Sequence, residues 1–581
     1  MKKELISLRQ IMAEQNIDYY IIPTTDFHGS EYVNDYFKCR KFVSGFSGSA
    51  GTLVISQNEA FLWADGRYFL QAAAQISGSG IELMKMGEPG VPTIQEYLES
   101  KKAPYVLGFD GRLASATEGR AYESIPGVDV VWNKDLVGMF WSERPAIIPS
   151  KVRALPLDIT GKSAEDKLRD VRKAMADKGA SCVLFNLLEE VAWLFNLRGN
   201  DVEDTPVFFS FALVTAEKAQ LFVMDGAVCE DIRRGLPFVE FKEYDEIYNE
   251  LAKLSADEVL WMDEDFANFA LRSCVADGVR IISDPTPVDL MKAVKNPTEI
   301  KGFENSHVKD GVAMARFMYW LDKNVGSGKE SEMSAAAYLD QCRYDEGAFE
   351  LSFPTISGYN SNGAIVHYDP QPDTNAMLKP EGLLLVDSGG QYEGGTTDIT
   401  RTIALGPLTQ KMKDYYTYVL KSHIALSTAT FEAGTTGYDL DILTRKPLRD
   451  EDLDFNHGTG HGVGHMLSCH EGPQYIATHH ADAPMLPGMI TSDEPGVYIE
   501  NEFGVRLENL LLSEELDDGR YGFTPLTLCP FDRKAIAVEK LTDDELAWVN
   551  DYHSWVRQIL TPLLEPEVAE WLAGATAEIT R

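Results

Sequence analysis

The sequence predicts two related α/β domains followed by a longer α+β domain. A repeat is the first observation: residues 5–26 and 167–190 each have the pattern of an amphipathic helix, a polar break and an apolar strand. A glycine-containing segment and then a hairpin follow both copies, which is the second observation. The third is that the strands beyond about residue 299 come as hairpins between helical segments, which is typical of α+β domains with antiparallel sheets.

Proline-containing segments separate the predicted domains. Residues 144–158 contain three prolines, and further prolines within 284–303 precede a long helical pattern that ends near Asn324. The predicted domains therefore span residues 1–155, 156–298 and 299–581. Any two unrelated α/β domains would also show a helix followed by a strand, which is the alternative to a duplication.

Individual elements follow from local patterns. In the last domain, helical periodicity covers residues 411–432, 438–450 and 542–575. Two hairpins are predicted in the same domain, at 382–405 with a turn near Glu393–Gly395, and at 489–512 with a turn around Asn501–Gly504.

Composition excludes several classes of partner. The chain has 581 residues, 44% of them hydrophobic, and a formal net charge of −37, so its field repels nucleic acid and anionic membranes. Seven scattered cysteines without a CxxC pair argue against a disulfide framework and for a reducing compartment. No signal-peptide core and no apolar run of about 18 residues is present, so we expect a cytoplasmic protein.

The first hairpin carries two unusual aspartates. Asp387 follows the apolar run LLLV, and Asp398 begins the return strand. A carboxylate beside buried aliphatic side chains is costly unless it is paired or bound to a cation. Across the ladder the two would raise each other's pKa unless a metal neutralised them. As an alternative, both are turn residues that accept hydrogen bonds from backbone amides.

The second hairpin repeats this feature. Glu494 precedes Pro495–Gly496, and Glu508 lies between Leu507 and a leucine run. Strand alternation would place Arg506 on the same face as Glu508, so a surface ion pair is the alternative for these two residues. The recurrence of two acids in a second apolar hairpin favours a shared cation site.

Residues 457–473 contain four histidines: His457, His461, His465 and His470. Four interspersed glycines make a helical face of ligands unlikely to form, and we expect them to let the backbone pass close to metals and peptide. Four carboxylates and one imidazole suit two cations such as Mn²⁺, Co²⁺ or Zn²⁺. Without thiolate ligands, a structural zinc site is not indicated.

Two other interpretations are weaker. The segment GTGHGVG has the glycine content of a phosphate-binding loop but lacks a preceding βαβ strand and a Walker lysine. Cys469 beside His470 could be a nucleophile, but neighbours in a strand point to opposite faces, so core packing is favoured for Cys469.

In this order, these residues resemble the pita-bread metallopeptidases, specifically the three-domain Xaa-Pro aminopeptidases (aminopeptidase P). The similarity rests on VDSGGQYEGGTTDITRT, HGTGHGVG, HEGP, TSDEPG and GVRLENLLL, with FVSGFSGSAGTLVI and LWADGRYFLQAA in the first domain. It runs nearly end to end. It implies two creatinase/prolidase N-terminal-like domains and a pita-bread catalytic domain.

The resemblance implies a dinuclear metal site. Asp387 would bind one metal, and His461 and Glu494 the other. Asp398 and Glu508 would bridge the two. The nucleophile would be a shared water or hydroxide, with Glu494 as proton acceptor and shuttle.

The resemblance also implies roles for residues around the metals. His367 and His470 would hold the substrate and stabilise the developing oxyanion, and His457 would line the proline pocket. Arg506 would orient Glu508, and Arg67 would reach the bound peptide unless it forms a structural salt bridge. The implied catalytic set is His367, His457, His470 and Glu494. The implied substrate-binding set is Arg67, His367, His461, His470 and Arg506.

The implied reaction is release of the N-terminal residue from peptides whose second residue is proline. The expected cofactors are two divalent ions, first Mn²⁺ and then Co²⁺ or Zn²⁺, and the expected assembly is a homodimer. Rival functions on the same fold are a prolidase, a methionine aminopeptidase, a creatinase-like amidinohydrolase and an inactive binding module. Cys469 departs from the family, which more usually has a small aliphatic residue there, and His465 has no implied role.

Overall fold

The computed structural model describes residues 2–479 and 483–581. Its chain forms two compact units, one of residues 1–157 with 162–289 and one of residues 158–161 with 290–581. Among the described helices, none combines the length and the apolar composition that crossing a membrane requires.

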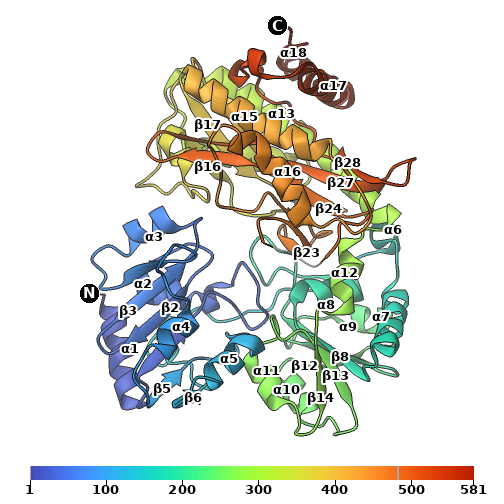
Figure 1. The fold of residues 1–581 in the computed structure, drawn as a ribbon. Coiled ribbons are helices and arrows are strands. Elements are labelled where there is room, and N and C mark those ends of the chain that lie inside the picture. Colours follow the sequence, from blue (N-terminus) through green and yellow to red (C-terminus); the bar gives the residue numbers. More distant parts are fainter. Residues whose placement is uncertain (1, 480–482) are drawn as a thin grey trace. The chain divides into compact units, whose positions relative to one another are not determined.

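The first unit contains two six-stranded sheets with the same topology (Figure 1). In spatial order the first consists of β4 (Glu82–Lys85), β3 (Ala60–Ala64), β2 (Thr52–Ser56), β1 (Tyr19–Ile22), β5 (Tyr105–Gly108) and β6 (Val128–Val131). The second consists of β12 (Glu240–Glu243), β11 (Ala219–Val223), β10 (Ser210–Thr215), β8 (Cys182–Phe185), β13 (Val259–Met262) and β14 (Arg280–Ser283). A short pair, β7 (Arg153–Ala154) and β9 (Leu197–Arg198), lies outside both sheets.

The pairing directions confirm that the two halves share one fold. β1 is antiparallel to β2 and parallel to β5, and β8 is likewise antiparallel to β10 and parallel to β13. The long helix that precedes each of these strands is α1 (Lys3–Glu14) or α7 (Ala164–Lys178). Both helices bury one apolar stripe, as their sequence periodicity predicts.

Shorter helices complete the two halves. In the first half they are α2 (Cys39–Ser44), α3 (Phe69–Gln75), α4 (Ile94–Glu99) and α5 (Ala116–Glu123). In the second half they are α8 (Leu188–Phe195), α9 (Glu230–Gly235), α10 (Glu246–Leu251) and α11 (Phe269–Cys274). Two further helices, α6 (Leu157–Thr160) and α12 (Pro287–Ala293), lie at the unit boundaries.

The second unit is α+β, and all its described strand pairs are antiparallel. Its largest sheet has the order β21 (Thr430–Phe431), β28 (Tyr521–Pro525), β27 (Asn509–Glu515), β24 (Ile490–Asp493), β22 (Gly460–Gly462) and β23 (Glu471–Ile476). Smaller sheets are β16 (Ile356–Tyr359), β17 (Leu383–Ser388) and β20 (Ile399–Ala404); β15 (Glu350–Leu351), β18 (Gly390–Tyr392) and β19 (Gly395–Thr396); and β25 (Gly496–Ile499) with β26 (Phe503–Arg506).

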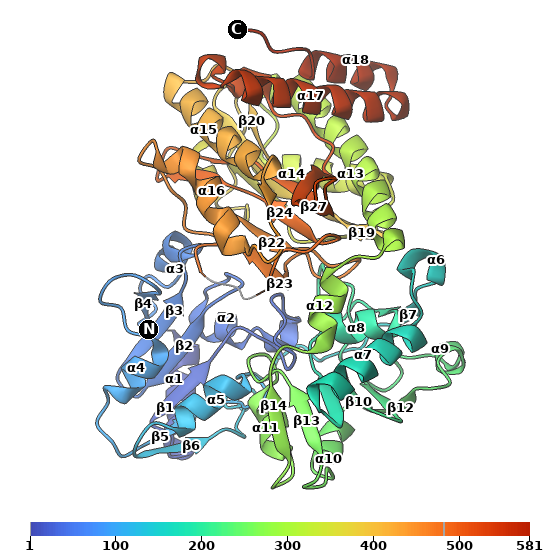
Figure 2. The same ribbon diagram turned by 45° about the vertical axis from the view of Figure 1, so that its right-hand side comes forward.

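Helices enclose these strands (Figure 2). They are α13 (Pro297–Asn324), α14 (Glu332–Asp345), α15 (Gln410–Ser427), α16 (Gly437–Arg449), α17 (Asp543–Leu560) and α18 (Pro566–Ala575). The longest, α13, begins at a capping box of Asn296 and Glu299 with Pro297 in its first turn. Met314 and Phe317 of α13 share a core with Leu384 and Val386 of β17. This core lies directly beside the strand that carries Asp387.

Most of the helices predicted in this unit are present, with two differences. The segment predicted as helix at 411–432 stops at Ser427, and Thr430–Phe431 instead pairs with β28 as strand β21. The segment predicted at 542–575 is two helices, because Pro562 and Pro566 lack the N–H that a continuous helix would need. The histidine-rich segment is not helical, as predicted, and contributes β22 instead.

Candidate metal centre

Asp387 and Asp398 come together through the β17–β20 ladder. Asp387 pairs in register with Thr400, so Asp398 lies two residues before the rung of Asp387. The intervening chain forms a separate hairpin in which Tyr392 pairs with Gly395, and Gly394 has a φ of 103°, which favours glycine. The predicted turn at 393–395 is therefore confirmed, and both aspartates are buried.

Glu494 and Glu508 flank one rung of the large sheet. Asp493 of β24 pairs with Asn509 of β27 in an antiparallel ladder. Glu494 follows Asp493 and Glu508 precedes Asn509, so the two glutamates lie opposite each other. Glu508 is tied to the first hairpin: its N–H donates to the Thr400 carbonyl at 3.1 Å, and Thr400 Oγ1 donates to its Oε2 at 2.7 Å. Thr400, which sequence reasoning missed, thus links the two acidic pairs.

His461 of β22 turns one ring nitrogen toward these acids. Its Nδ1 lies 2.9 Å from the Gly462 carbonyl oxygen, which can only accept, so Nδ1 carries the proton. The other ring nitrogen, Nε2, lies 3.4 Å from Asp398 Oδ2 and 3.5 Å from Glu494 Oε1. An imidazole oriented in this way is a common metal ligand.

Three of the four acids keep a buried oxygen without a partner. Within residues 2–479 and 483–581, Asp387 Oδ1, Asp398 Oδ1 and Glu508 Oε1 have no hydrogen-bond donor. One ligand atom from each of Asp398, His461 and Glu508 lies within 4.8 Å of the other two. Because an unsatisfied buried carboxylate is costly, these residues fit divalent cations, as the sequence predicts.

The pKa shifts of the four acids agree with a cation site, because burial opposes their negative charge. Burial, reinforced by Asp398 and its neighbours, raises the pKa of Glu508 well above its usual range, and burial raises the pKa of Glu494 to about 7. Burial also raises the pKa of Asp387, although Arg506 opposes it. For Asp398 the burial cost is outweighed by His461, His470 and the Cys469 thiol, and its pKa is lowered.

Arg506 contacts Asp387 rather than Glu508. Its guanidinium donates to Asp387 Oδ2 at 2.6 Å, to the Tyr498 hydroxyl at 2.7 Å and to Thr400 Oγ1 at 3.2 Å. Arg506 was predicted to orient Glu508, and it reaches that carboxylate only through the Thr400 hydroxyl. Strand β26 ends at Arg506, so the two-residue alternation does not extend to Glu508.

The predicted histidines lie in different settings around the acids. His457 Nε2 lies 2.7 Å from the Tyr498 hydroxyl, and burial lowers the pKa of His457 well below its usual value. The ring centroids of His461 and His470 are 4.4 Å apart. His367 also lowers the pKa of His457, and its neighbour Val366 accepts a hydrogen bond from Arg506, so His367 borders the same region. His465 is buried instead beside Glu299 and Phe303 of α13.

Cys469 packs in the interior, as predicted, but not only against apolar side chains. It is buried, but its Sγ lies 3.2 Å from Asp398 Oδ2 and so borders the acids rather than only the core. Strand alternation does not apply because Cys469 lies in a bend before β23 begins at Glu471. Its position next to His470 was the available signal.

Glycines in the histidine-rich segment admit neighbouring protein atoms. A Cβ at Gly460 would lie 2.0 Å from the Ser492 carbonyl oxygen, and one at Gly462 would lie 2.5 Å from that of Glu471. β22 is therefore packed between β24 and β23 too closely for any side chain at these positions. This closeness, rather than room for metals and peptide, explains these two glycines.

Arg67, from the first unit, is held by acids of that unit. Its Nε lies 2.9 Å from Asp65 Oδ1, and its Nη1 lies 3.9 Å from Glu31 Oε1. Its guanidinium therefore forms the salt bridge that was the alternative to a peptide-binding role. The two roles are compatible, because the side chain is partly exposed.

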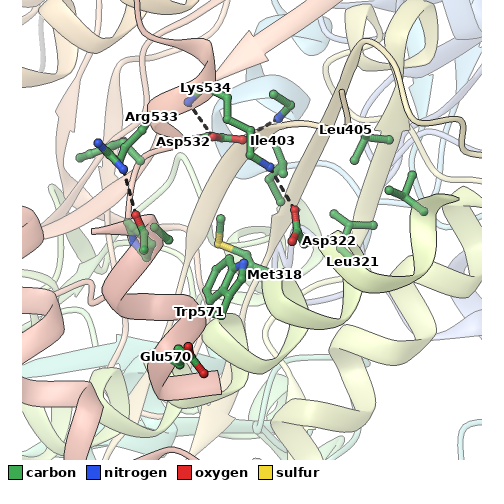
Figure 3. A pocket seen from close by; sticks show the side chains of 16 residues that line it. Met318, Leu321, Asp322, Ile403, Leu405, Asp532, Arg533, Lys534, Glu570 and Trp571 are labelled. Carbon is green, nitrogen blue, oxygen red and sulfur yellow. Dashed lines mark hydrogen bonds and ion pairs between the residues drawn. The ribbon is translucent and has the colours of Figure 1, made fainter. Parts of the chain in front are cut away.

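The second unit also holds a cavity of about 320 Å³ next to α13, β20 and α18 (Figure 3). Apolar side chains such as Met318, Ile403 and Trp571 line it, and Lys534 pairs with Asp322 at 3.1 Å. The predicted site residues are not among its described lining residues. The candidate centre is therefore the acid cluster and not this cavity.

Comparisons with known proteins agree with this fold and site. Family models for the creatinase/prolidase N-terminal domain match residues 5–137 and 143–299. Models for metallopeptidase family M24 and for the C-terminal region of peptidase M24 match residues 301–515 and 519–579. The fold and the site thus define an M24 metallopeptidase with two creatinase-type N-terminal domains.

Curated relatives specify the family more narrowly. The chain is 38% identical to a probable Xaa-Pro aminopeptidase P of Coprinopsis cinerea, over 99% of this chain and 98% of that protein. It is 36% identical to aminopeptidase P1 of Arabidopsis thaliana over the full length of both. A crystal structure of X-prolyl aminopeptidase from Caenorhabditis elegans, described as a cytosolic enzyme with a di-nuclear active site, superposes with a TM-score of 0.96 at 32% identity, covering 99% of each chain. The chain belongs to the Xaa-Pro aminopeptidase P family, which confirms the predicted fold class and family.

Proposed function

We propose that this protein is a metal-dependent aminopeptidase that releases the N-terminal residue from peptides whose second residue is proline. The observation that carries the proposal is the meeting of four carboxylates and one imidazole, three of the carboxylates with a buried partnerless oxygen. Relatives named for this activity cover essentially the whole chain, including both N-terminal domains.

Five residues would hold the two cations. Asp387 would bind one, His461 and Glu494 the other, and Asp398 and Glu508 would be shared by both. The approach of His461 Nε2 to both Asp398 and Glu494 supports this division. When bound, such ions supply a water nucleophile of lowered pKa and polarise the scissile carbonyl.

Protein groups position the substrate and move the protons. The Glu494 carboxylate accepts the proton of the attacking water and passes it to the leaving proline nitrogen. His367 and His470 donate hydrogen bonds toward the carbonyl oxygen that becomes negatively charged. His457, held by Tyr498, borders the proline ring, and Arg506 fixes Asp387. Arg67, whose side chain is partly exposed, is a further candidate for peptide binding.

A proline at the second position of the substrate requires a binding site that differs from the one for other residues. The proline nitrogen has no N–H to donate, and its ring fixes φ, so a site shaped for that ring rejects ordinary residues. The same geometry would serve a prolidase if the site required the free carboxylate of a dipeptide. The choice between these two reactions is therefore made by substrate length.

Further properties complete the proposal. The oxygen-rich ligand set favours Mn²⁺, with Co²⁺ or Zn²⁺ as alternatives. Seven cysteines without disulfides and the cytosolic description of the nematode relative support a cytoplasmic location. The net charge of −37 disfavours nucleic acid and anionic membranes as partners. We expect a homodimer, which sedimentation tests.

Matched peptides test the activity. The protein is assayed on an Xaa-Pro-Yaa tripeptide and on the corresponding Xaa-Pro dipeptide, first after EDTA treatment and then after Mn²⁺ is added back. We expect cleavage of the tripeptide only after Mn²⁺ returns. Preference for the dipeptide would establish a prolidase, and cleavage that persists in EDTA after removal of bound metal would contradict the metal mechanism.

A further inference from the structure

The thiol of Cys469 borders the candidate metal centre. Its Sγ–H donates to Asp398 Oδ2 at 3.2 Å, and the side chain is buried. Two of the other buried cysteines have different surroundings: Cys529 Sγ lies 3.6 Å from Met318 Sδ, and Cys182 Sγ lies 3.8 Å from a backbone carbonyl. Cys469 therefore differs from these two cysteines in contacting a carboxylate.

Three potential ligands converge at this position. One ligand atom from each of Asp398, Cys469 and His470 lies within 4.8 Å of the other two. This group shares Asp398 with the group formed by Asp398, His461 and Glu508. The two groups therefore overlap in one carboxylate.

The second observation is that this hydrogen bond leaves Asp398 able to bind a cation. The Cys469 thiol donates a hydrogen bond to Asp398 Oδ2, but Asp398 Oδ1 is buried and has no hydrogen-bond donor in residues 2–479 and 483–581. A hydrogen bond from Cys469 therefore does not satisfy this carboxylate. A cation would do so, and a neighbouring sulfur determines which cations can bind.

We propose that Asp398, Cys469 and His470 form a binding position for a soft divalent cation, of the type of Zn²⁺ in excess or Cd²⁺. Thiolate and imidazole select such ions, whereas the surrounding carboxylates favour Mn²⁺. On binding, the sulfur–hydrogen bond is replaced by a sulfur–metal bond and one proton is released to solvent. No oxidant or reductant is required.

Occupation of this position inhibits peptide cleavage. Asp398 is the proposed bridging ligand and His470 the proposed substrate-binding histidine, so a soft cation removes both from their roles. This part of the inference rests on the proposed function. The binding of the soft cation does not.

Absorption spectroscopy tests the binding. The full-length protein, loaded with Mn²⁺, is titrated with Cd²⁺ while the ultraviolet thiolate-to-cadmium charge-transfer band is recorded. Two variants remove the sulfur: Cys469→Val, and Cys469→Ser, which keeps a hydrogen-bond donor for Asp398. Cys229→Ser is the matched control because Cys229 is exposed and shows no contact with a candidate ligand.

We expect the band in the parent protein and in Cys229→Ser. In the Cys469 variants the band is lost, and Cd²⁺ affinity measured by competition with a chromogenic chelator falls by about 10- to 100-fold. An unchanged band in folded Cys469→Ser would overturn the proposal.

Inhibition is measured on the same proteins with an Xaa-Pro-Yaa peptide. Measured against its own rate with Mn²⁺ alone, Cys469→Val needs about 10- to 100-fold more Cd²⁺ for half-inhibition than the parent does. Equal inhibition of parent and variant would show that Cd²⁺ acts by replacing Mn²⁺ at the carboxylates, which contradicts the proposal. If the parent does not cleave the peptide, the proposed function fails, and the absorption titration still decides the binding of the soft cation.

Discussion

Two kinds of buried acid lie in the second unit, and they are neutralised in different ways. Asp441 receives the Arg445 guanidinium on both oxygens, at 2.9 and 2.8 Å, and Asp310 receives Arg343 at 2.8 Å together with two hydroxyls. At the candidate metal centre, Asp387 also has an arginine, Arg506, but one of its oxygens has no donor in the described part of the chain.

The comparison shows what distinguishes a metal ligand from a structural acid. Burial alone does not, because Asp310 and Asp441 are as buried as Asp398. The difference is that the structural acids have a protein donor for each oxygen, whereas Asp387, Asp398 and Glu508 do not. Single partnerless oxygens also occur among the described residues on Asp26, Glu471 and Asp493, so it is the convergence of three such acids with His461 that marks the site for a cation.

The largest effect is expected from removing the bridging charge. Asp398→Asn should lower metal content and reduce Xaa-Pro-Yaa cleavage by about a thousandfold or more, the equivalent of about 4 kcal/mol of barrier. Metal analysis of dialysed protein and a steady-state assay measure the two effects. Retained activity in this variant would contradict a dinuclear mechanism.

Breaking a structural acid–arginine pair should lower the stability of the fold without lowering the metal content. Asp441→Asn leaves Arg445 with only the partly exposed Asp454 as a counter-charge, so we expect unfolding to become easier by about 1.5–3 kcal/mol. Metal bound per folded molecule should stay as in the parent protein. Chemical denaturation and metal analysis check this, and a loss of metal without a loss of stability would reverse the assignment of the two classes.

Arg506 connects the two kinds of acid, because it is an arginine partner, like Arg343 and Arg445, but its carboxylate is the candidate metal ligand Asp387. Arg506→Lys keeps the charge but loses the planar fork that holds Asp387, Tyr498 and Thr400 together. We expect about 10- to 100-fold weaker metal binding or turnover, with little change in stability. Metal titration followed by activity measures it, and wild-type values for both would show that Arg506 only fills space.

The smallest effect concerns His553, a buried group that in the described chain pairs with neither an arginine nor a metal and is uncharged in the folded protein. Burial and nearby arginines lower the pKa of His553 from 6.5 to about 3, and its Nε2 accepts the Phe531 N–H at 3.1 Å. The folded protein keeps this imidazole neutral, whereas the unfolded chain takes up a proton below pH 6.5. The stabilisation is therefore complete above pH 6.5 and is lost as the pH falls toward 3, by about 1.4 kcal/mol per pH unit.

A matched variant isolates that contribution. His553→Gln offers an amide oxygen to the same N–H but does not titrate. Between pH 6.5 and 5 its free energy of unfolding should fall less steeply than that of the parent, as urea denaturation at each pH would show. Equal slopes would mean that His553 does not titrate differently on folding.

Much of this architecture was predictable because local patterns determine it. The repeat of helix and strand at residues 5–26 and 167–190 predicted two sheets that share one topology, and the glycine turn at 393–395 predicted the hairpin that brings Asp387 and Asp398 together. The break after Ser427 was missed because helical periodicity does not report where a following strand finds a partner.

The contacts inside the site were less predictable. Arg506 binding to Asp387 and Cys469 reaching Asp398 both arise where a strand has ended, so the alternation of side chains no longer applies. Thr400 contacts Glu508, which lies 108 residues further along the chain, and no local pattern encodes such a pairing. These contacts depend on how distant hairpins pack.

The central claim is that these acids hold two divalent cations, and metal stoichiometry tests it most directly. The protein is equilibrated with Mn²⁺, freed of excess ion by dialysis, and analysed for metal beside Asp398→Asn and Asp441→Asn. We predict about two ions per chain in the parent protein and in Asp441→Asn, and far fewer in Asp398→Asn. A parent protein that retains none, or an Asp398→Asn variant that retains as many as the parent, would contradict the claim.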